Sequence, residues 1–423
     1  MLRFAPSPTG DMHIGNLRVA LFNYICSLQR EEPLLIRIED TDQERTIPGK
    51  EKEIFEILSL FGIHYQEQQL QSNNIRFHRA MALQLLQDKK AFNCFCRKEM
   101  LDAKRNAAEE NKIPYCYDGA CENLLPEEVI DNPNPFTIRL KKPAHSITLD
   151  DMIKGESTFT PDEIDSFILL NTDKSPTYNF ACAVDDMLSD VSFIIRSEDH
   201  LSDTPKQIAI HEALGYTKKI EYAHIPNIIG DDSISVKSLL EEGYLPDAIS
   251  NYLIVMGNTT PVKIFDLKEA IKWFDLKALS NTPLHFDIET LKSINREHLK
   301  GLDPKELSRY VGFADEEIGN LAKLFLEKAS TLKELRVAIG AIFAPKTVPE
   351  KYKNAFETLR TLTQKAPHFD DYDAYKGYLS EKSALEEDTL LRALRLLISG
   401  TEEGPELGDL YTYIKNYLKE VVK

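Results

Sequence analysis

The chain has 423 residues, 42% of them hydrophobic and 28% charged, with a formal net charge of −17. This composition is ordinary for a folded protein of about three domains, and the acidic total argues against nucleic-acid binding over the whole surface, though not against local basic patches. No run of about 18 apolar residues occurs, which excludes a transmembrane helix, and the N-terminus MLRFAPSPTG lacks a secretory signal pattern, so we expect a cytoplasmic protein.

The N-terminal part alternates between strand and helix patterns. The strand-like segment LRFAPS leads through the loop PTGDMHIG into the helical segment NLRVALFNYICSLQR, and the apolar run LLIRI follows. Strand, helix and strand within about forty residues form a βαβ unit, which predicts a parallel sheet. Two more helices are expected, one over EKEIFEILSLFGI, where Gly62 suits the C-terminal end, and one over residues 74–92.

Cysteines gather in the next segment. Four of the six cysteines lie between residues 94 and 121, namely Cys94, Cys96, Cys116 and Cys121. A disulfide framework is not expected in a long cytosolic chain, so this clustering indicates a metal site. The segment has few apolar repeats and interrupts the pattern, and we interpret it as an insertion. Strand patterns return at PFTIRLKK and VSFIIRSED.

The second half of the chain is helical. From about residue 235, the segments SVKSLLEEGYLPDAISNYLIVMG and FDLKEAIKWFDL have helical spacing, and beyond residue 303 strand patterns are scarce. The sequence therefore predicts an N-terminal α/β domain, a helical connector and a C-terminal helical bundle.

The segment between the first strand and the first helix has the features of a nucleotide site. In open α/β sheets, ligands bind beyond the carboxyl ends of the strands, at helix N-termini. Gly10 and Gly15 permit close approach of a ligand to the backbone, and His13 is able to donate a hydrogen bond to a phosphate oxygen. The alternative is a simple Pro-Thr-Gly turn with a surface histidine.

Several motifs in order resemble the bacterial glutamyl-tRNA synthetases. They are APSPTG followed by HIGN, LLIRIEDTDQER, PTYNFACAVDDMLSDVSFIIRSEDHLSDTPKQ, EYAHIPNIIG, SLLEEGYLPDAISNYL and LRLLISGTEEGPELGDL. HIGN resembles the HIGH motif of class I aminoacyl-tRNA synthetases. The resemblance implies a Rossmann-type α/β catalytic domain in two halves (1–72 and 171–230), an inserted acceptor-binding subdomain (73–170), a helical stem-contact region (231–302) and an all-α anticodon-binding domain (303–423).

The resemblance also implies site residues. His13, Gly15 and Asn16 would be catalytic, and Pro8, Thr9 and Gly10 would bind ATP together with His13 and Gly15. For glutamate, Arg3 and Arg196 would hold carboxylates, Ser7 and Glu39 the ammonium group, and Tyr178 and Cys182 would complete the pocket. The alternatives are a surface position for Arg3, a salt bridge of Arg196 with Asp199, pairing of Glu39 with Arg45, and plain packing for Cys182. Two acidic pairs, Asp40 with Asp42 and Asp185 with Asp186, could hold Mg²⁺ or act as general bases, but we expect structural roles for them.

The family reaction needs no protein nucleophile. The α-carboxylate of glutamate attacks the α-phosphate of ATP, with Mg²⁺ present, and the adenylate then transfers glutamate to the 2′-hydroxyl of the terminal adenosine of tRNA. Positioning and charge stabilisation supply the catalysis. The partners implied are L-glutamate and the tRNA for glutamate, glutamine or both, with no membrane, and the protein would be a monomer.

The cysteine segment resembles a zinc site of some relatives, which use CxC, a tyrosine and a later cysteine. On that pattern the ligands would be Cys94, Cys96, Tyr117 and Cys121, with Cys116 as an alternative to Tyr117. The role of such a zinc ion would be structural.

One family feature is missing. Class I synthetases grip the ATP phosphates with a lysine-rich loop, which this family carries between HIPNIIG and DDSISVKSLL, but here Gly230 is followed directly by Asp231. Either the protein has lost the loop or the printed sequence leaves its residues out. We expect that they are left out, because the flanking segments are complete. An intact mass above that of the printed sequence would confirm this. Two rival functions remain. One is a non-catalytic tRNA-binding paralogue. The other is glutamyl transfer to a modified tRNA base, but the enzymes that catalyse it lack the helical C-terminal part.

Overall fold

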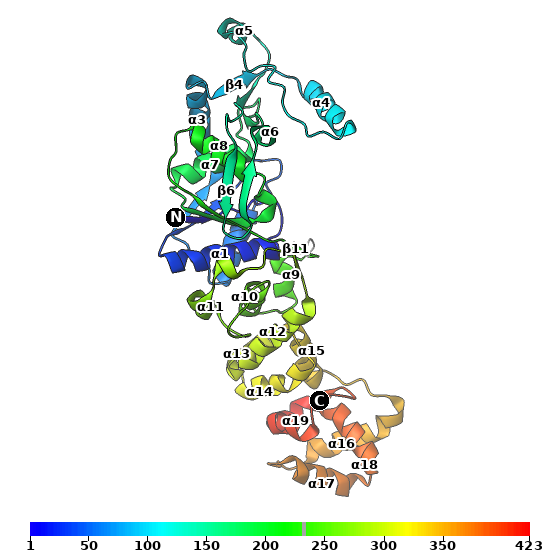
Figure 1. Cartoon of the computed structure of the whole chain (residues 1–423). Coiled ribbons are helices and arrows are strands. Elements are labelled where there is room, and N and C mark those ends of the chain that lie inside the picture. The colour runs from blue at the N-terminus through cyan, green and yellow to red at the C-terminus, as the bar shows by residue number, and fades with distance from the viewer. Residues whose placement is uncertain (231–233) are drawn as a thin grey trace. The chain divides into compact units, whose positions relative to one another are not determined.

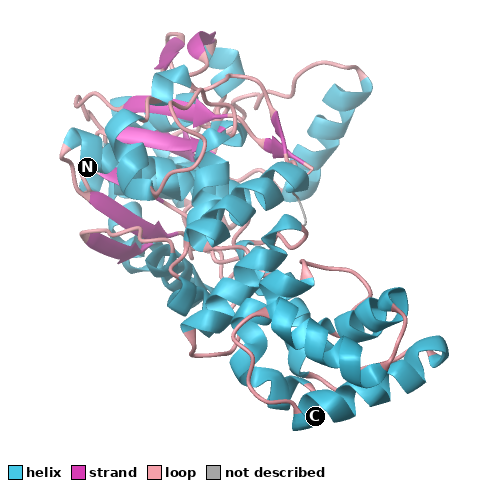
Figure 2. Cartoon of the chain, turned by 90° about the horizontal axis from the view of Figure 1, so that it is seen from below, coloured by secondary structure: helices cyan, strands magenta, loops and turns pink. Residues whose placement is uncertain are grey.

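The computed structural model describes residues 1–230 and 234–423. It divides into two compact units (Figure 1). The first comprises Met1–Val236, Leu253–Pro261 and Leu267–Phe286, and the second comprises Lys237–Tyr252, Val262–Asp266 and Asp287–Lys423. Among the described residues every strand belongs to the first unit, whereas the second is helical (Figure 2). The predicted α/β part followed by a helical part is confirmed.

A seven-stranded sheet forms the centre of the first unit, in the order β3-β2-β1-β9-β10-β6-β7. Its strands are β1 (Leu2–Phe4), β2 (Leu34–Ile38), β3 (Glu67–Leu70), β6 (Ile147–Asp151), β7 (Gly155–Phe159), β9 (Phe193–Ser197) and β10 (Glu221–Ile225). Neighbouring strands are parallel except in the β6–β7 hairpin. The strand order reverses between β1 and β9, and ligands of open α/β sheets bind at such a point.

Helices connect and cover these strands. They are α1 (Ile14–Arg30), α2 (Lys50–Leu60), α3 (Ile75–Gln87), α6 (Pro161–Ile164), α7 (Tyr178–Leu188), α8 (Thr204–Ala213) and α11 (Leu267–Trp273), with short 3-10 turns η1 (Gln71–Asn74), η2 (Glu198–His200) and η3 (Leu276–Ala278). The α1 helix packs against β1, β2 and β9, and α8 packs against β6. A two-strand pair, β11 (Ile228–Ile229) and β12 (Leu284–His285), completes the unit. The predicted first helix and the LLIRI strand are confirmed.

The insertion has its own antiparallel sheet of β4 (Ala91–Cys94), β5 (Thr137–Leu140) and β8 (Ile168–Leu170), with helices α4 (Lys98–Glu110) and α5 (Pro126–Ile130). The expected helix over 74–92 was too long. It ends at Gln87 because Lys89 adopts a left-handed conformation with φ 57°, after which Ala91 pairs with Leu140 of β5. The β6–β7 hairpin was not predicted, although Ile147–Asp151 alternates between buried and exposed residues.

The remaining helices are α9 (Val236–Glu241), α10 (Pro246–Val255), α12 (Ile288–Gly301), α13 (Pro304–Tyr310), α14 (Glu316–Leu324), α15 (Leu332–Phe343), α16 (Lys353–Lys365), α17 (Tyr372–Ser383), α18 (Glu387–Ser399), α19 (Leu407–Ile414) and α20 (Leu418–Val421), with 3-10 turns η4 (Phe325–Glu327), η5 (Glu350–Tyr352) and η6 (Lys415–Tyr417). Gly243 separates α9 from α10. Its φ is +88°, and a Cβ there would lie 2.8 Å from Leu332 N, so only glycine fits. No helix within the described ranges has the length and apolar character needed to cross a membrane.

Candidate active site and candidate metal centre

The HIGN segment lies where the sheet and α1 meet. His13 immediately precedes α1 in an extended conformation, and its side chain does not cap the helix. Since the first N–H groups of a helix lack partners within it and carry partial positive charge, this end favours a phosphate group. The described chain leaves open space beside Gly10, because a Cβ there would meet no atom within 4 Å.

Two cavities flank His13. The first, of about 440 Å³, is lined among others by Ser7, Thr9, Gly10, His13 and Asn16. The second, of about 410 Å³, is lined by His13, Gly15, Asn16 and residues that follow β9 and β10. His13 and Asn16 therefore line both.

Pro8 is the one predicted ATP-binding residue that lines neither of these two cavities. It is buried, and its carbonyl accepts the N–H of Ile47 at 2.9 Å. Glu39 N–H donates in the same way to Pro6 O at 3.0 Å. These bonds tie the loop to the segment that follows β2, so Pro8 shapes the loop.

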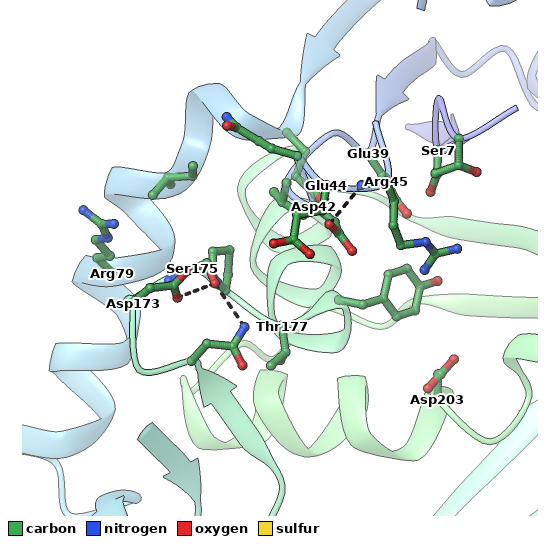
Figure 3. A pocket seen from close by; sticks show the side chains of 18 of the residues that line it. Ser7, Glu39, Asp42, Glu44, Arg45, Arg79, Asp173, Ser175, Thr177 and Asp203 are labelled. Atoms are coloured by element: carbon green, nitrogen blue, oxygen red, sulfur yellow. Dashed lines mark hydrogen bonds between the residues drawn. The ribbon is translucent and has the colours of Figure 1, made fainter. Parts of the chain in front are cut away.

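A third cavity, of about 980 Å³, adjoins the first. Ser7 and Thr9 line both of them, and Glu39 and Tyr178 lie on the larger one (Figure 3). Sequence reasoning missed several other polar side chains that line it, including Arg45, Arg79, Asp173, His200 and Asp203. Arg45 lies within the motif LLIRIEDTDQER and could have been found from it. Arg79 and Asp173 had no such signal, because tertiary packing alone brings them here.

A cluster of buried charges, here named the Glu39 cluster, comprises Arg3, Arg37, Glu39, Cys182 and Asp186. Asp186 Oδ1 lies 2.7 Å from Arg37 Nη2 and 3.3 Å from Arg3 Nε. Arg37 Nη2 lies 3.8 Å from Glu39 Oε1, and the Cys182 thiol donates to the same oxygen at 3.0 Å. Arg3 is thus buried rather than on the surface, and Glu39 contacts Arg37 and Cys182, not Arg45.

Burial and charge set the protonation of this cluster. Burial alone would raise the pKa of Asp186, but the charges of Arg37 and Arg3 lower it to about 2. Burial raises the pKa of Glu39 despite Arg37. Burial, followed by the charge of Glu39, raises the pKa of the Cys182 thiol well above its usual value. A thiol that stays protonated is a hydrogen-bond donor and not a nucleophile.

Arg196, on β9, is 5% exposed, and every nitrogen of its guanidinium donates a hydrogen bond. Nε donates to His224 Nε2 at 3.1 Å, Nη1 to Gln207 Oε1 at 3.0 Å and Nη2 to Thr204 Oγ1 at 2.7 Å. These partners replace the alternative salt bridge with Asp199. The lining of the large cavity does not include Arg3, Cys182 or Arg196. Burial raises the pKa of Tyr178, which does line it, and the charges of Arg196 and Arg3 oppose this rise.

The predicted acidic pairs are structural. Asp40 accepts hydrogen bonds from Ser72 N at 2.8 Å and Ser72 Oγ at 2.7 Å. Asp185 accepts from Gln71 and Asn74 and contacts His78 Nε2 at 3.0 Å. Asp40 therefore holds η1 in place, and Asp185 holds both η1 and the start of α3.

Three thiols of the insertion meet at one place. The sulfur atoms of Cys94, Cys96 and Cys121 all lie within 4.8 Å of one another. The hydroxyl of Tyr117 lies 3.4 Å from both Cys94 Sγ and Cys96 Sγ. Three sulfurs and a phenol oxygen supply four donor atoms, the number that a structural zinc ion takes. Cys116 is not part of the group, since its thiol donates to Asp165 Oδ1 at 3.2 Å. Of the two alternative fourth ligands, Tyr117 therefore lies beside the three thiols and Cys116 does not.

The lysine-rich loop of the family would follow Gly230, and residues 231–233 at this junction lie outside the described residues. Ser235, just beyond them, lines the cavity beside His13. Ser235, on the described side of the junction, therefore contributes to the first cavity.

Comparison with known proteins identifies the family. Residues 1–293 match the family model for the catalytic domain of class I tRNA synthetases (E and Q). The chain is 59% identical over 432 positions to glutamate–tRNA ligase 2 of Sulfurimonas denitrificans and 49% identical to glutamate–tRNA ligase 1 of Campylobacter curvus, with all of both chains covered. A crystal structure of a glutamate tRNA ligase from Elizabethkingia meningosepticum matches with a TM-score of 0.84 and 25% identity, covering 100% of this chain and 98% of that one. The chain belongs to the class I tRNA synthetases of the glutamate and glutamine group.

Proposed function

We propose that the protein attaches glutamate to tRNA with ATP, through glutamyl-adenylate and transfer to the 2′-hydroxyl of the terminal adenosine. One observation carries this proposal: Ser7 and Thr9 line both the cavity beside His13 and the large cavity that holds Glu39 and Tyr178. Adjoining cavities for a nucleotide and an amino acid place the carboxylate of the amino acid close to the α-phosphate. Positioning of this kind supplies much of the rate enhancement.

Glutamate would enter the large cavity with its ammonium group toward Ser7 and Glu39 and its carboxylates toward Arg3 and Arg196. An ammonium group beside Glu39 favours the ionised carboxylate, against the effect of burial. Tyr178 would pack and hydrogen-bond beside the bound amino acid, and Cys182 orients Glu39 through its thiol hydrogen bond. Planar guanidinium groups suit carboxylates because they donate two parallel hydrogen bonds.

His13, Gly15 and Asn16 act on ATP, together with Thr9 and Gly10 in the loop. His13 donates a hydrogen bond to a phosphate oxygen, and the N–H groups at the start of α1 stabilise the negative charge that grows there. Pro8 has a supporting role through its bond to Ile47. Mg²⁺, bound with ATP, would neutralise phosphate charge.

The other parts of the chain have roles in tRNA binding. In our proposal residues 1–72 and 171–230 form the catalytic domain, 73–170 bind the acceptor end, 231–302 contact the stem and 303–423 bind the anticodon. Cys94, Cys96, Tyr117 and Cys121 would hold a structural zinc ion that braces the insertion. The protein would act as a cytoplasmic monomer.

The test is charging of purified glutamate tRNA and glutamine tRNA, separately, with radiolabelled glutamate, ATP and Mg²⁺. Charging of either supports the proposal, and the ratio between them gives the tRNA specificity. The intact mass of the protein is measured first, because it decides whether the lysine-rich loop is present. Binding of tRNA without charging would overturn the proposal in favour of a non-catalytic paralogue.

A further inference from the structure

We propose that His224 is a positioning residue that fixes Arg196 through an unprotonated Nε2 atom, and that Asp151 sets this state of the imidazole. The proposal rests on the proposed function, in which Arg196 binds a carboxylate of glutamate. It adds two residues, from β6 and β10, that touch no substrate but decide how Arg196 is presented.

The sheet brings His224 and Arg196 together. Strands β9 and β10 are parallel, and His224 is the register partner of Arg196. Arg196 Nε lies 3.1 Å from His224 Nε2. A guanidinium N–H can only donate, so His224 Nε2 must offer its lone pair. The imidazole is therefore neutral, with its proton on Nδ1.

Asp151 accounts for that proton. Its Oδ2 lies 2.6 Å from His224 Nδ1 and accepts the His224 backbone N–H at 3.0 Å. Its Oδ1 accepts the backbone N–H groups of Ile153 at 2.9 Å and Lys154 at 2.8 Å. Asp151 and His224 are 2% and 0% exposed. A carboxylate held by this many donors has little freedom to turn, so it keeps the proton on Nδ1.

The arrangement leaves Arg196 with a defined set of free donors. Of its five N–H groups, one each goes to His224, Gln207 and Thr204, which leaves one on each terminal nitrogen. Two donors on one planar group match the two oxygens of a carboxylate. If the bond to His224 were lost, the guanidinium could rotate, and this match would be lost with it.

Protonation of His224 would break the bond, since an N–H on Nε2 would then face the N–H of Arg196. The charged or titratable groups that face His224 are Asp151 from β6, Arg196 from β9 and His200 from η2, with the Thr204 hydroxyl of α8 at 3.0 Å from Nε2. Burial lowers the pKa of His224, Asp151 raises it, and Arg196 and His200 lower it further. The pKa of His224 is therefore lowered, so the imidazole is neutral near neutral pH and becomes charged only toward the acid end of the range.

The test compares four variants of the full-length enzyme in tRNA charging, namely His224→Phe, His224→Gln, His211→Gln and Arg196→Gln. KM for glutamate and kcat are measured from about pH 5.5 to about pH 8. His224→Phe removes the acceptor and should raise KM about 10- to 100-fold, because a buried hydrogen bond to a charged group is lost, with a smaller change in kcat. His224→Gln keeps an acceptor oxygen that does not titrate, so KM should rise less and should lose its increase at acid pH. His211→Gln is the matched control, because His211 is also buried but contacts Ala183 O.

A second readout does not need activity. NMR of protein with isotope-labelled histidine should show His224 with a protonated Nδ1 and a bare Nε2, and Arg196→Gln should shift the Nε2 signal. A proton on Nε2, or an unchanged KM in His224→Phe while Arg196→Gln raises KM, would overturn the inference. An unchanged KM in Arg196→Gln, or no charging by the wild type, would instead overturn the proposed function, and the NMR result would still decide the role of His224.

Discussion

The Glu39 cluster and the thiol cluster (Cys94, Cys96, Tyr117 and Cys121) differ in how they are completed. In the Glu39 cluster, two arginines face two carboxylates, and Asp186 lies within 3.3 Å of Arg3 and 2.7 Å of Arg37. In the thiol cluster, sulfur and phenol groups face one another. In the first, folding brings each charged side chain close to one of opposite charge. The second has only electron-pair donors, so in our proposal a zinc ion would complete it.

The strongest way to sharpen this comparison is to remove one thiol. Cys121→Ser should abolish stoichiometric zinc binding, because a structural zinc site needs all its ligands. Stability should fall with it, because such sites contribute about 10 kcal/mol or more of folding free energy. Metal content and thermal unfolding with and without a chelator measure the effect.

Cys116→Ser is the matched control, since Cys116 lies in the same segment but bonds to Asp165. It should bind zinc like the wild type. Equal zinc content in the Cys121 and Cys116 variants would contradict the assignment.

The Glu39 cluster should depend on its own charges instead. Asp186→Asn keeps the shape of the side chain but leaves Arg3 and Arg37 without their shared anion, and breaking a buried pair costs about 3–5 kcal/mol. Urea unfolding measures the loss. Asp190→Asn is the control, since Asp190 forms an exposed pair with Lys218, and exposed pairs contribute little to stability. A similar loss of unfolding free energy in both variants would show that burial does not strengthen the ion pairs of Asp186.

The wild type and Asp186→Asn should differ less in free energy of unfolding at acid pH than at neutral pH. The pKa of Asp186 is lowered to about 2 in the folded protein, so its contribution is complete above about pH 4, where an aspartate of the unfolded chain is ionised, and is lost as the pH falls through about 2. Unfolding at about pH 7 and about pH 3 tests this. A difference that stays constant with pH would show that the charge of Asp186 is not the cause.

The smallest effect concerns Arg139, the cation beside the thiol cluster. Its guanidinium lies 4.3 Å from the centre of the Tyr117 ring, and Nη1 donates to Ser166 O at 2.7 Å. Arg139→Gln should weaken zinc binding about 10- to 100-fold, because it removes the positive charge that offsets the thiolates.

Competition with a chelating dye measures the affinity. Lys142→Gln, which removes an exposed lysine paired with Asp162, should leave it unchanged. An equal loss of zinc affinity in both variants would show that position beside the site, rather than charge, matters.

Local patterns predicted much of this protein. Helical spacing located α1, and the run LLIRI coincides with β2 at Leu34–Ile38, because neighbours in the sequence set these periods. Residue chemistry and spacing indicated the thiol cluster, since Cys94, Cys96 and Cys121 lie within one short insertion. The ordered motifs singled out Ser7, His13 and Glu39, which line adjoining cavities in the structure.

Tertiary structure alone decided the partners of the buried charges. Asp186 was expected to have a structural role, but its pairing with Arg3 and Arg37 follows from α7 packing near β1 and β2. The unpredicted β6 strand places Asp151 beside His224, and β9 places Arg196 opposite it. Sequence spacing carries no record of these distances, because the order of strands in the sheet determines which side chains share a hydrogen bond.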